Sequence, residues 1–187
     1  MSGLVAARAR NIRAAQNFVA LFVVRNIVRL AARDEIVKLL MRNQSINLVV
    51  TGNPKWQEMI KHLRVDHLQD LGIVDLNQGS TASRSGLVSE ILKVCRVTVN
   101  VPDPPNDLGI LDHTLSMRDL SRVALLHFDL VRERQYGIDL FAALRYLIME
   151  SRKLVLFIQS RHPFIELLPR DHPLSAIDIK TVELRGR

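Results

Sequence analysis

Apolar and polar positions along this chain follow two patterns. Short apolar runs, many with β-branched residues, read INLVV at 46–50, GIVDL at 72–76, RVTVNV at 96–101, VALLHFD at 123–129, KLVLFIQS at 153–160 and IDIKTVEL at 177–184. Runs of this length bounded by polar and turn residues predict buried strands. Between them, apolar residues return every three or four positions, most clearly over 55–71 and 137–150, which predicts helices. Strands that alternate with helices from residue 72 to 184 predict an α/β fold with three layers and a mostly parallel sheet.

The first third of the chain has a different character. Residues 1–33 contain no acidic residue and six arginines. Arg25, Arg29 and Arg33 recur every fourth position and form one polar stripe, which leaves an apolar face opposite. This pattern predicts a basic amphipathic helix that packs on another surface. We therefore divide the chain into a basic, mainly helical N-terminal region, 1–68, and an α/β domain, 69–187.

The same arginine-rich start permits two other interpretations. An N-terminal segment without acids is typical of a mitochondrial transit peptide, and a basic amphipathic helix can also lie on a membrane surface. The apolar run FVALFVV is closed by Arg25 and is too short to span a membrane. We expect a cytoplasmic protein, with mitochondrial import as the alternative.

Composition narrows the remaining classes. The chain has 187 residues, 48% of them hydrophobic, which suffices for one well-buried core. Its one cysteine, Cys95, excludes an intramolecular disulfide framework and a cysteine-rich zinc site. The net charge of +7 favours acidic partners, nucleic acid among them, but no dense basic run with interleaved aromatics follows the N-terminus.

The segment from Gly72 to Asp103 contains the candidate ligand-binding loop. It reads as a strand, a loop of small polar residues, a helix and a second strand, which is the arrangement of a phosphate-binding unit. Against the template G-x-x-x-x-G-K-[ST], residues 78–85 match only at Ser85; Gln78 and Ser83 replace the glycines and Arg84 replaces the lysine. The candidate nucleotide-binding residues are Gly79, Ser80, Thr81, Ser83, Arg84, Ser85 and Asp129. The sequence TGNP at 51–54 is a second candidate loop, which we interpret as an ordinary turn because no Gly-Lys-Ser/Thr follows it.

The order of these features resembles the core of the STAND and AAA-like P-loop ATPases. The loop at 78–85, the Walker B-like strand VALLHFD ending in Asp129, the strand LVLFIQS and the proline-rich link into IDIKTVEL carry the resemblance, and it is most similar to the degenerate, inactive STAND domains. The resemblance implies that Arg84 stands in place of the phosphate-binding lysine. It also implies that Ser85 and Asp129 keep the positions that hold Mg²⁺, if Mg²⁺ binds.

The departures from the motif predict loss of catalysis. Without the glycines, Cβ atoms stand where the backbone should approach phosphate, and an extended arginine does not reproduce the contact of a lysine. We expect a non-catalytic signalling or scaffold module, with no required cofactor, that contacts other proteins through the N-terminal helical region or the sheet surface. The alternative is a switch that binds ATP and Mg²⁺ but hydrolyses ATP slowly or not at all.

Two rival classes remain open. Asp129, Ser160 and Lys180 follow successive strands in the order of the phosphoacceptor aspartate, hydroxyl and lysine of a receiver domain. A metal-dependent nuclease would need carboxylates and a lysine that converge on a metal ion. The candidates are Asp178, Lys180 and Glu183. In this alternative, His127 could also pair with Asp129.

Overall fold

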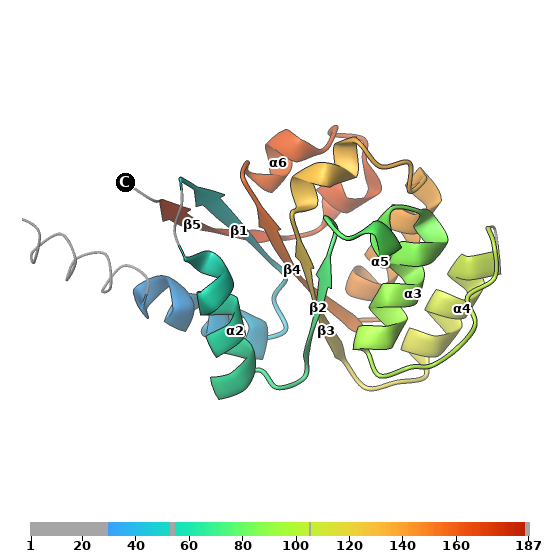
Figure 1. The fold of residues 1–187 in the computed structure, drawn as a ribbon, viewed down its shortest axis with the longest axis horizontal. Coiled ribbons are helices and arrows are strands. Elements are labelled where there is room, and N and C mark those ends of the chain that lie inside the picture. The colour runs from blue at the N-terminus through green and yellow to red at the C-terminus, as the bar shows by residue number, and fades with distance from the viewer. Residues whose placement is uncertain (1–29, 53–54, 105, 186–187) are drawn as a thin grey trace, which may run out of the picture.

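A five-stranded, all-parallel sheet forms the centre of the molecule (Figure 1). The structure is a computed structural model, and it describes residues 30–52, 55–104 and 106–185. The strands are β1 (Ile46–Thr51), β2 (Leu71–Asp75), β3 (Ser121–Leu126), β4 (Leu154–Ser160) and β5 (Lys180–Arg185). Their order across the sheet is β2-β3-β4-β1-β5, so β2 and β5 lie at the two edges. The predicted parallel α/β sheet is confirmed.

Burial along the strands follows their place in the sheet. All seven residues of β4 are buried, because β3 and β1 flank this strand and helices cover both of its faces. In the edge strand β5, only Val182 and Leu184 are buried, and the residues that alternate with them face solvent. The continuous apolar run LVLFI therefore marks the centre of the sheet.

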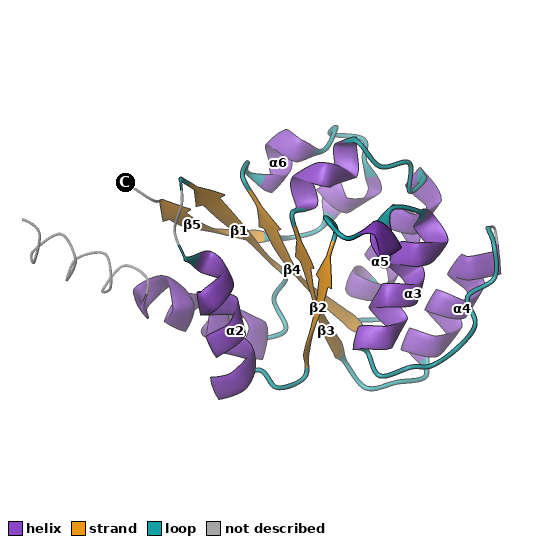
Figure 2. Cartoon of the chain, viewed as in Figure 1, coloured by secondary structure: helices purple, strands orange, loops and turns teal. Residues whose placement is uncertain are grey.

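Helices cover both faces of the sheet and complete three layers (Figure 2). A helix over residues 30–41 and α2 (Trp56–Asp66) pack on one face. The other face carries α3 (Arg84–Val94), α4 (Asn106–Ser116), α5 (Ile138–Met149) and α6 (Phe164–Leu167), with the 3-10 segments η1 (Gly79–Thr81), η2 (Phe128–Arg132) and η3 (Pro173–Ala176) at the strand and helix ends. The first core contains Ile36, Leu40 and Leu63, and the second contains Leu87, Leu111 and Leu144.

The structure revises three expectations. β1 pairs with both β4 and β5, so the described part of the N-terminal region completes the sheet and does not form a helical unit of its own. The run RVTVNV forms no strand in the structure, although Val97 and Val101 pack against the core. β3 ends at Leu126, and Asp129 lies in the 3-10 segment η2 that follows.

The predicted basic stripe lies mostly outside the described residues. Only Arg33, in the helix over 30–41, belongs to the described part of the chain, where it contacts Asp34 at 3.4 Å. The buried residues Ala32, Ile36 and Leu40 recur every fourth position on the same helix. This end of the predicted amphipathic helix therefore packs on the sheet. Among the described residues, no helix has the length and apolarity that a membrane span requires.

A pH effect on stability is expected where η3 packs on α5. The ring centroids of His172 and Phe141 are 4.7 Å apart. Nδ1 of His172 accepts a hydrogen bond from the backbone N–H of Leu174 at 3.3 Å. Burial lowers the pKa of His172, and the nearby Asp171 only partly opposes this. The folded state therefore favours the neutral ring, whose stabilisation is present above the unfolded-state pKa of about 6.5 and is lost as pH falls through the folded-state pKa.

Replacement of this ring by a non-titrating acceptor tests the effect. We expect the free energy of unfolding of His172→Asn to fall less steeply below about pH 6.5 than that of the unmodified protein, because the asparagine still accepts from Leu174 but binds no proton. Urea unfolding at a series of pH values measures it. Parallel profiles for the two proteins would contradict the expectation.

Candidate functional site

The topology singles out the carboxyl ends of β1 and β4, a position we call the crevice, as the candidate ligand site. In open parallel sheets, ligands bind outside the carboxyl ends of the strands, where neighbouring strands connect to opposite faces. β1 leads into α2 on one face, and its neighbour β4 leads into α6 on the other. The carboxyl ends of β1 and β4 therefore form the switch point of this fold.

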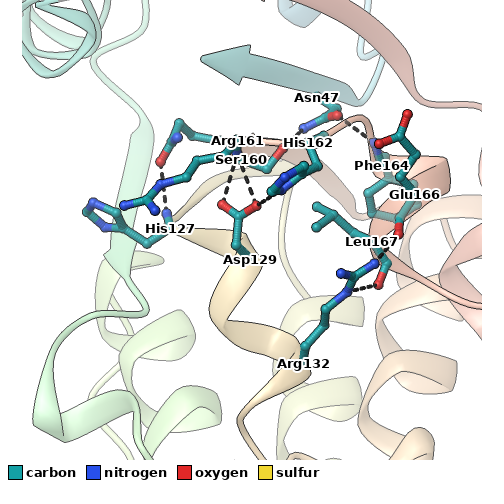
Figure 3. Close-up of polar contacts among 11 residues, drawn as sticks. Asn47, His127, Asp129, Arg132, Ser160, Arg161, His162, Phe164, Glu166 and Leu167 are labelled. Atoms are coloured by element: carbon teal, nitrogen blue, oxygen red, sulfur yellow. Dashed lines mark hydrogen bonds and ion pairs between the residues drawn. The ribbon is translucent and has the colours of Figure 1, made fainter. Parts of the chain in front are cut away.

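A buried asparagine joins the two strands at this crevice (Figure 3). Asn47, in β1, is fully buried, and its Nδ2 donates to Oγ of Ser160 at 2.7 Å. Its Oδ1 accepts from the backbone N–H of Phe164 at 2.9 Å, at the start of α6. The Ser160 hydroxyl in turn donates to the carbonyl of His162 at 2.7 Å. Asn47 thus holds the turn after β4 against β1.

Asp129 lies beside the same turn, and its carboxylate is hydrogen-bonded to residues of that turn. Both oxygens accept from the backbone N–H of Arg161, at 3.1 and 2.9 Å, and Oδ1 lies 3.0 Å from Nδ1 of His162 (Figure 3). The Asp129 side chain is 23% exposed. It accordingly joins η2 to the residues that follow β4.

A second histidine and carboxylate pair lies at the ends of β2 and β3. Nδ1 of His127 is 2.7 Å from Oδ1 of Asp75, and the ring makes an edge contact with Trp56 at 5.5 Å between centroids. His127 has a left-handed backbone, with φ of 55°, and its N–H donates to Oε1 of Gln159 at 2.9 Å. His127 does not pair with Asp129, as the nuclease alternative would require, because this left-handed turn directs the ring toward β2.

The predicted phosphate loop, residues 78–85, follows the edge strand β2 and lies two strands away from the switch-point pair. It folds closely onto its own helix. Thr81 is buried and donates its hydroxyl to the carbonyls of Asp75 and Gln78, at 3.1 and 2.8 Å. Ser83 caps α3 by accepting from the N–H of Gly86 at 3.1 Å. Gly79, Ser80 and Ser83 are exposed, and Ser85 is half-buried.

The close packing extends to the glycine in the first turn of α3. A Cβ on Gly86 would lie 2.1 Å from the carbonyl oxygen of Ser80, so only glycine fits there. Gly86 therefore allows the close contact between η1 and α3.

Arg84 forms ion pairs with carboxylates on two other helices. Its Nε and Nη2 donate to the two oxygens of Asp107, at 2.8 and 2.5 Å, and its Nη1 donates to Asp139. Asp107 is fully buried, and the Arg84 side chain is 12% exposed. The hydrogen bond to Asp107 is the largest factor that raises the pKa of Arg84, while burial opposes it. The guanidinium thus joins α3 to α4 and α5.

The predicted site residues therefore fall into two groups. Within the described ranges, no hydrogen bond or ion pair connects Asp129 to residues 79–85. Nor does that part of the chain contain a cluster of three or more His, Cys, Asp or Glu side chains able to hold a metal ion. Nucleotide binding by these residues stays a prediction, and the geometry assigns Thr81, Ser83 and Arg84 to packing contacts.

The strand order also decides against a receiver domain. A flavodoxin-like receiver sheet has the order 2-1-3-4-5, whereas this sheet has the order 2-3-4-1-5. Lys180 begins β5 beside Ile46, which also pairs with Phe157, so it lies toward the amino end of the sheet from Ser160. Its ammonium group lies 3.1 Å from Asp178, while Glu183 pairs with Arg185, so the candidate nuclease carboxylates do not converge.

Several important residues were not among the sequence candidates. Asn47 and Asp107 are fully buried polar residues that hold elements together. Asn47 carried a signal, because it interrupts an otherwise apolar strand run. No sequence signal marked Asp107 as buried, because its partner Arg84 is 23 residues away along the chain.

Comparisons with known proteins agree on the fold. No protein-family model matches the chain, and no curated protein matches its sequence. Among solved structures, a chain of the Drosophila ORC bound to DNA superposes with a TM-score of 0.61 at 13% identity, over 86% of this chain and 93% of that one. ORC1 of Aeropyrum pernix in complex with DNA gives a TM-score of 0.62 at 19% identity, over 85% of this chain and 45% of that one. A Walker-type ATPase of Pyrococcus abyssi gives 0.54 at 14% identity, over 83% and 53%.

These likenesses confirm the predicted fold, a three-layer α/β fold with a parallel sheet of the P-loop NTPase type. The chain spans about half the length of the last two structures.

Proposed function

We propose that this P-loop-type fold is a non-hydrolysing module that acts as a signalling or scaffold component of a protein assembly. The observation that carries the proposal is the connection after β1, the strand at the switch point. It consists of residues 52–55 and reads GNPK before Trp56 opens α2. A phosphate loop needs glycines that let backbone N–H groups surround phosphate, followed by a lysine and a hydroxyl residue. This connection has neither the length nor the Lys-Ser/Thr pair.

The groups around the crevice favour the same proposal. Mg²⁺ requires oxygen ligands in near-octahedral geometry. Both Asp129 oxygens already accept from the backbone N–H of Arg161, and Oδ1 also contacts Nδ1 of His162. Ser85 lies on α3, which follows the edge strand β2. These contacts favour the loss of Mg²⁺–nucleotide binding, and we derive no catalytic step through such a complex. A fold that keeps the sheet without this machinery can serve as a rigid platform for partner proteins.

Phosphate release from ATP tests the loss of catalysis. We expect the purified chain with ATP and Mg²⁺ to release phosphate no faster than buffer alone, against turnover of about 1–1,000 per second for typical enzymes. Asp129→Ala should behave identically. Turnover that disappears in Asp129→Ala but persists in Asp103→Ala, an exposed control, would contradict the proposal.

Nucleic-acid binding is a second candidate function, favoured by the distribution of charge. Residues 1–29 hold five arginines and no acid, whereas Lys and Arg nearly balance Asp and Glu over the rest of the chain. Two of the similar structures, the Drosophila ORC and the ORC1 of Aeropyrum pernix, are bound to DNA. We propose that the arginine-rich segment, which lies outside the described residues, contacts phosphates without reading sequence.

The salt dependence of DNA binding tests this second function. Replacement of Arg8, Arg10 and Arg13 by glutamine should weaken binding to duplex DNA and lower the slope of log K against log salt by up to about 3, because each phosphate contact releases counterions. Fluorescence anisotropy at several salt concentrations measures both quantities. A triple variant with unchanged affinity and slope would contradict the assignment.

A further inference from the structure

A hollow of about 410 Å³ lies at the amino ends of β2 and β3, whereas the crevice lies at the carboxyl ends of β1 and β4. The end of α3, the segment before β3, the first residues of β3 and Asp70, which precedes β2, form its walls. Its apolar lining includes Val94, Met117 and Leu120, and Cys95 lies in the wall. This volume suits a small organic molecule, since ligand sites occupy about 300–1,000 Å³.

Three arginines line the hollow, and among the described residues one of them forms an ion pair. Arg122 lies 2.5 Å from Asp70 and also donates to Asn43 at 2.9 Å. Arg96 and Arg118 are exposed and form no ion pair with any other residue that the structure describes. Asp119 is the remaining charged residue of the lining. With Arg122 and Asp70 cancelling each other, the lining keeps a net positive charge.

The C-terminal ends of two helices near the hollow disfavour the binding of an anion, but their effect is smaller than that of the arginine charges. α3 and α4 both end there, and carbonyl groups at a helix C-terminus carry partial negative charge worth about 0.3–1 kcal/mol near the surface. Several of these carbonyls are already capped, those of Leu92 and Lys93 by the N–H groups of Val97 and Arg96. Asp119 offsets one of the two guanidinium charges of Arg96 and Arg118. The remaining full charge outweighs these screened dipoles, and the planar guanidinium groups match carboxylate and phosphate groups.

We propose that this hollow binds a small organic anion. Arg96 and Arg118 hold its phosphate or carboxylate group, and its apolar part packs on Val94, Met117 and Leu120. The site is independent of the crevice between β1 and β4 and of whether nucleotide binds there.

Calorimetry with two aromatic anions tests the site and distinguishes the two anionic groups. Phenyl phosphate and benzoate are titrated into the full chain, with benzyl alcohol as the neutral match. We expect saturable heat from at least one anion at concentrations on the order of 1 mM, and none from the alcohol. Arg118→Gln should weaken binding by about tenfold, because it removes a charge-assisted hydrogen bond. Arg96→Asn, which suits the left-handed backbone of that position (φ 60°), should have the same effect.

Cys95 locates the bound anion, because it is the only cysteine of the chain. Burial raises the pKa of its thiol, so we expect slow reaction with the neutral reagent 4,4′-dithiodipyridine and further slowing when the anion is bound. Arg64→Gln, on the exposed side of α2, is the matched control and should keep both binding and protection. Absence of heat from both anions, equal heat from benzyl alcohol, unchanged binding in Arg118→Gln or an unprotected Cys95 would each overturn the proposal.

Discussion

Arg84→Met should lower the free energy of unfolding by about 3–5 kcal/mol, because it leaves a buried carboxylate without its cation. Asp107 is fully buried and receives two hydrogen bonds from the Arg84 guanidinium. Without them, the hydrogen bond that remains to Asp107 from the described residues is that of the Leu108 N–H, at 2.9 Å. The same change also removes the contact to Asp139, and with it the polar connection of α3 to α4 and α5. Urea unfolding followed by circular dichroism measures the loss.

Two further variants show that the effect comes from the unpaired carboxylate. Arg64→Met, on the exposed side of α2, should change stability by less than about 0.5 kcal/mol. Adding Asp107→Asn to Arg84→Met should restore at least half of the loss, since a neutral amide costs less to bury and still accepts from Leu108. A small effect of Arg84→Met on stability, together with a large effect on ATP binding, would reverse the assignment and return Arg84 to a phosphate-binding role.

Asn47→Leu should destabilise the protein by about 2–4 kcal/mol, because it leaves buried polar groups without partners. The leucine fills a similar space but neither donates to Ser160 nor accepts from the N–H of Phe164. Both lost contacts lie at the crevice between β1 and β4. The expected loss therefore measures how firmly the protein's own side chains hold this crevice together.

The exposed Asn100 provides the control for Asn47. Asn100→Leu should change the free energy of unfolding by less than about 0.5 kcal/mol. Thermal unfolding of the two variants gives the comparison directly. Equal stability of Asn47→Leu and the unmodified protein would mean that water replaces the lost hydrogen bonds, and that the crevice is open to solvent.

The strands and helices could largely be predicted from the sequence because burial on two faces leaves a local pattern. The run LVLFIQS became β4, and the helical spacing at 137–150 became α5. The strand predicted for the run RVTVNV was wrong because of tertiary contacts. Its β-branched residues favour a strand, but none of the five described strands pairs with it, and Val97 and Val101 pack on the helical core.

The site could not be predicted in the same way, because strand order depends on contacts distant in sequence. Both the β1–α2 and the β2–α3 connections read as strand, loop and helix, and the polar loop at 78–85 resembled a phosphate loop more closely. Only the order β2-β3-β4-β1-β5 shows that β1, and not β2, borders the switch point. Asn47 and Ser160, which meet there, are 113 residues apart.

Calorimetric titration of the full chain with ATP and Mg²⁺ tests the central claim most directly, with Asp129→Ala and Arg84→Met in parallel. The proposed scaffold function predicts no saturable heat at ATP concentrations on the order of 1 mM for any of the three proteins. Saturable binding by the unmodified chain that disappears in Asp129→Ala, while Asp103→Ala retains it, would contradict the claim and establish a nucleotide-binding switch.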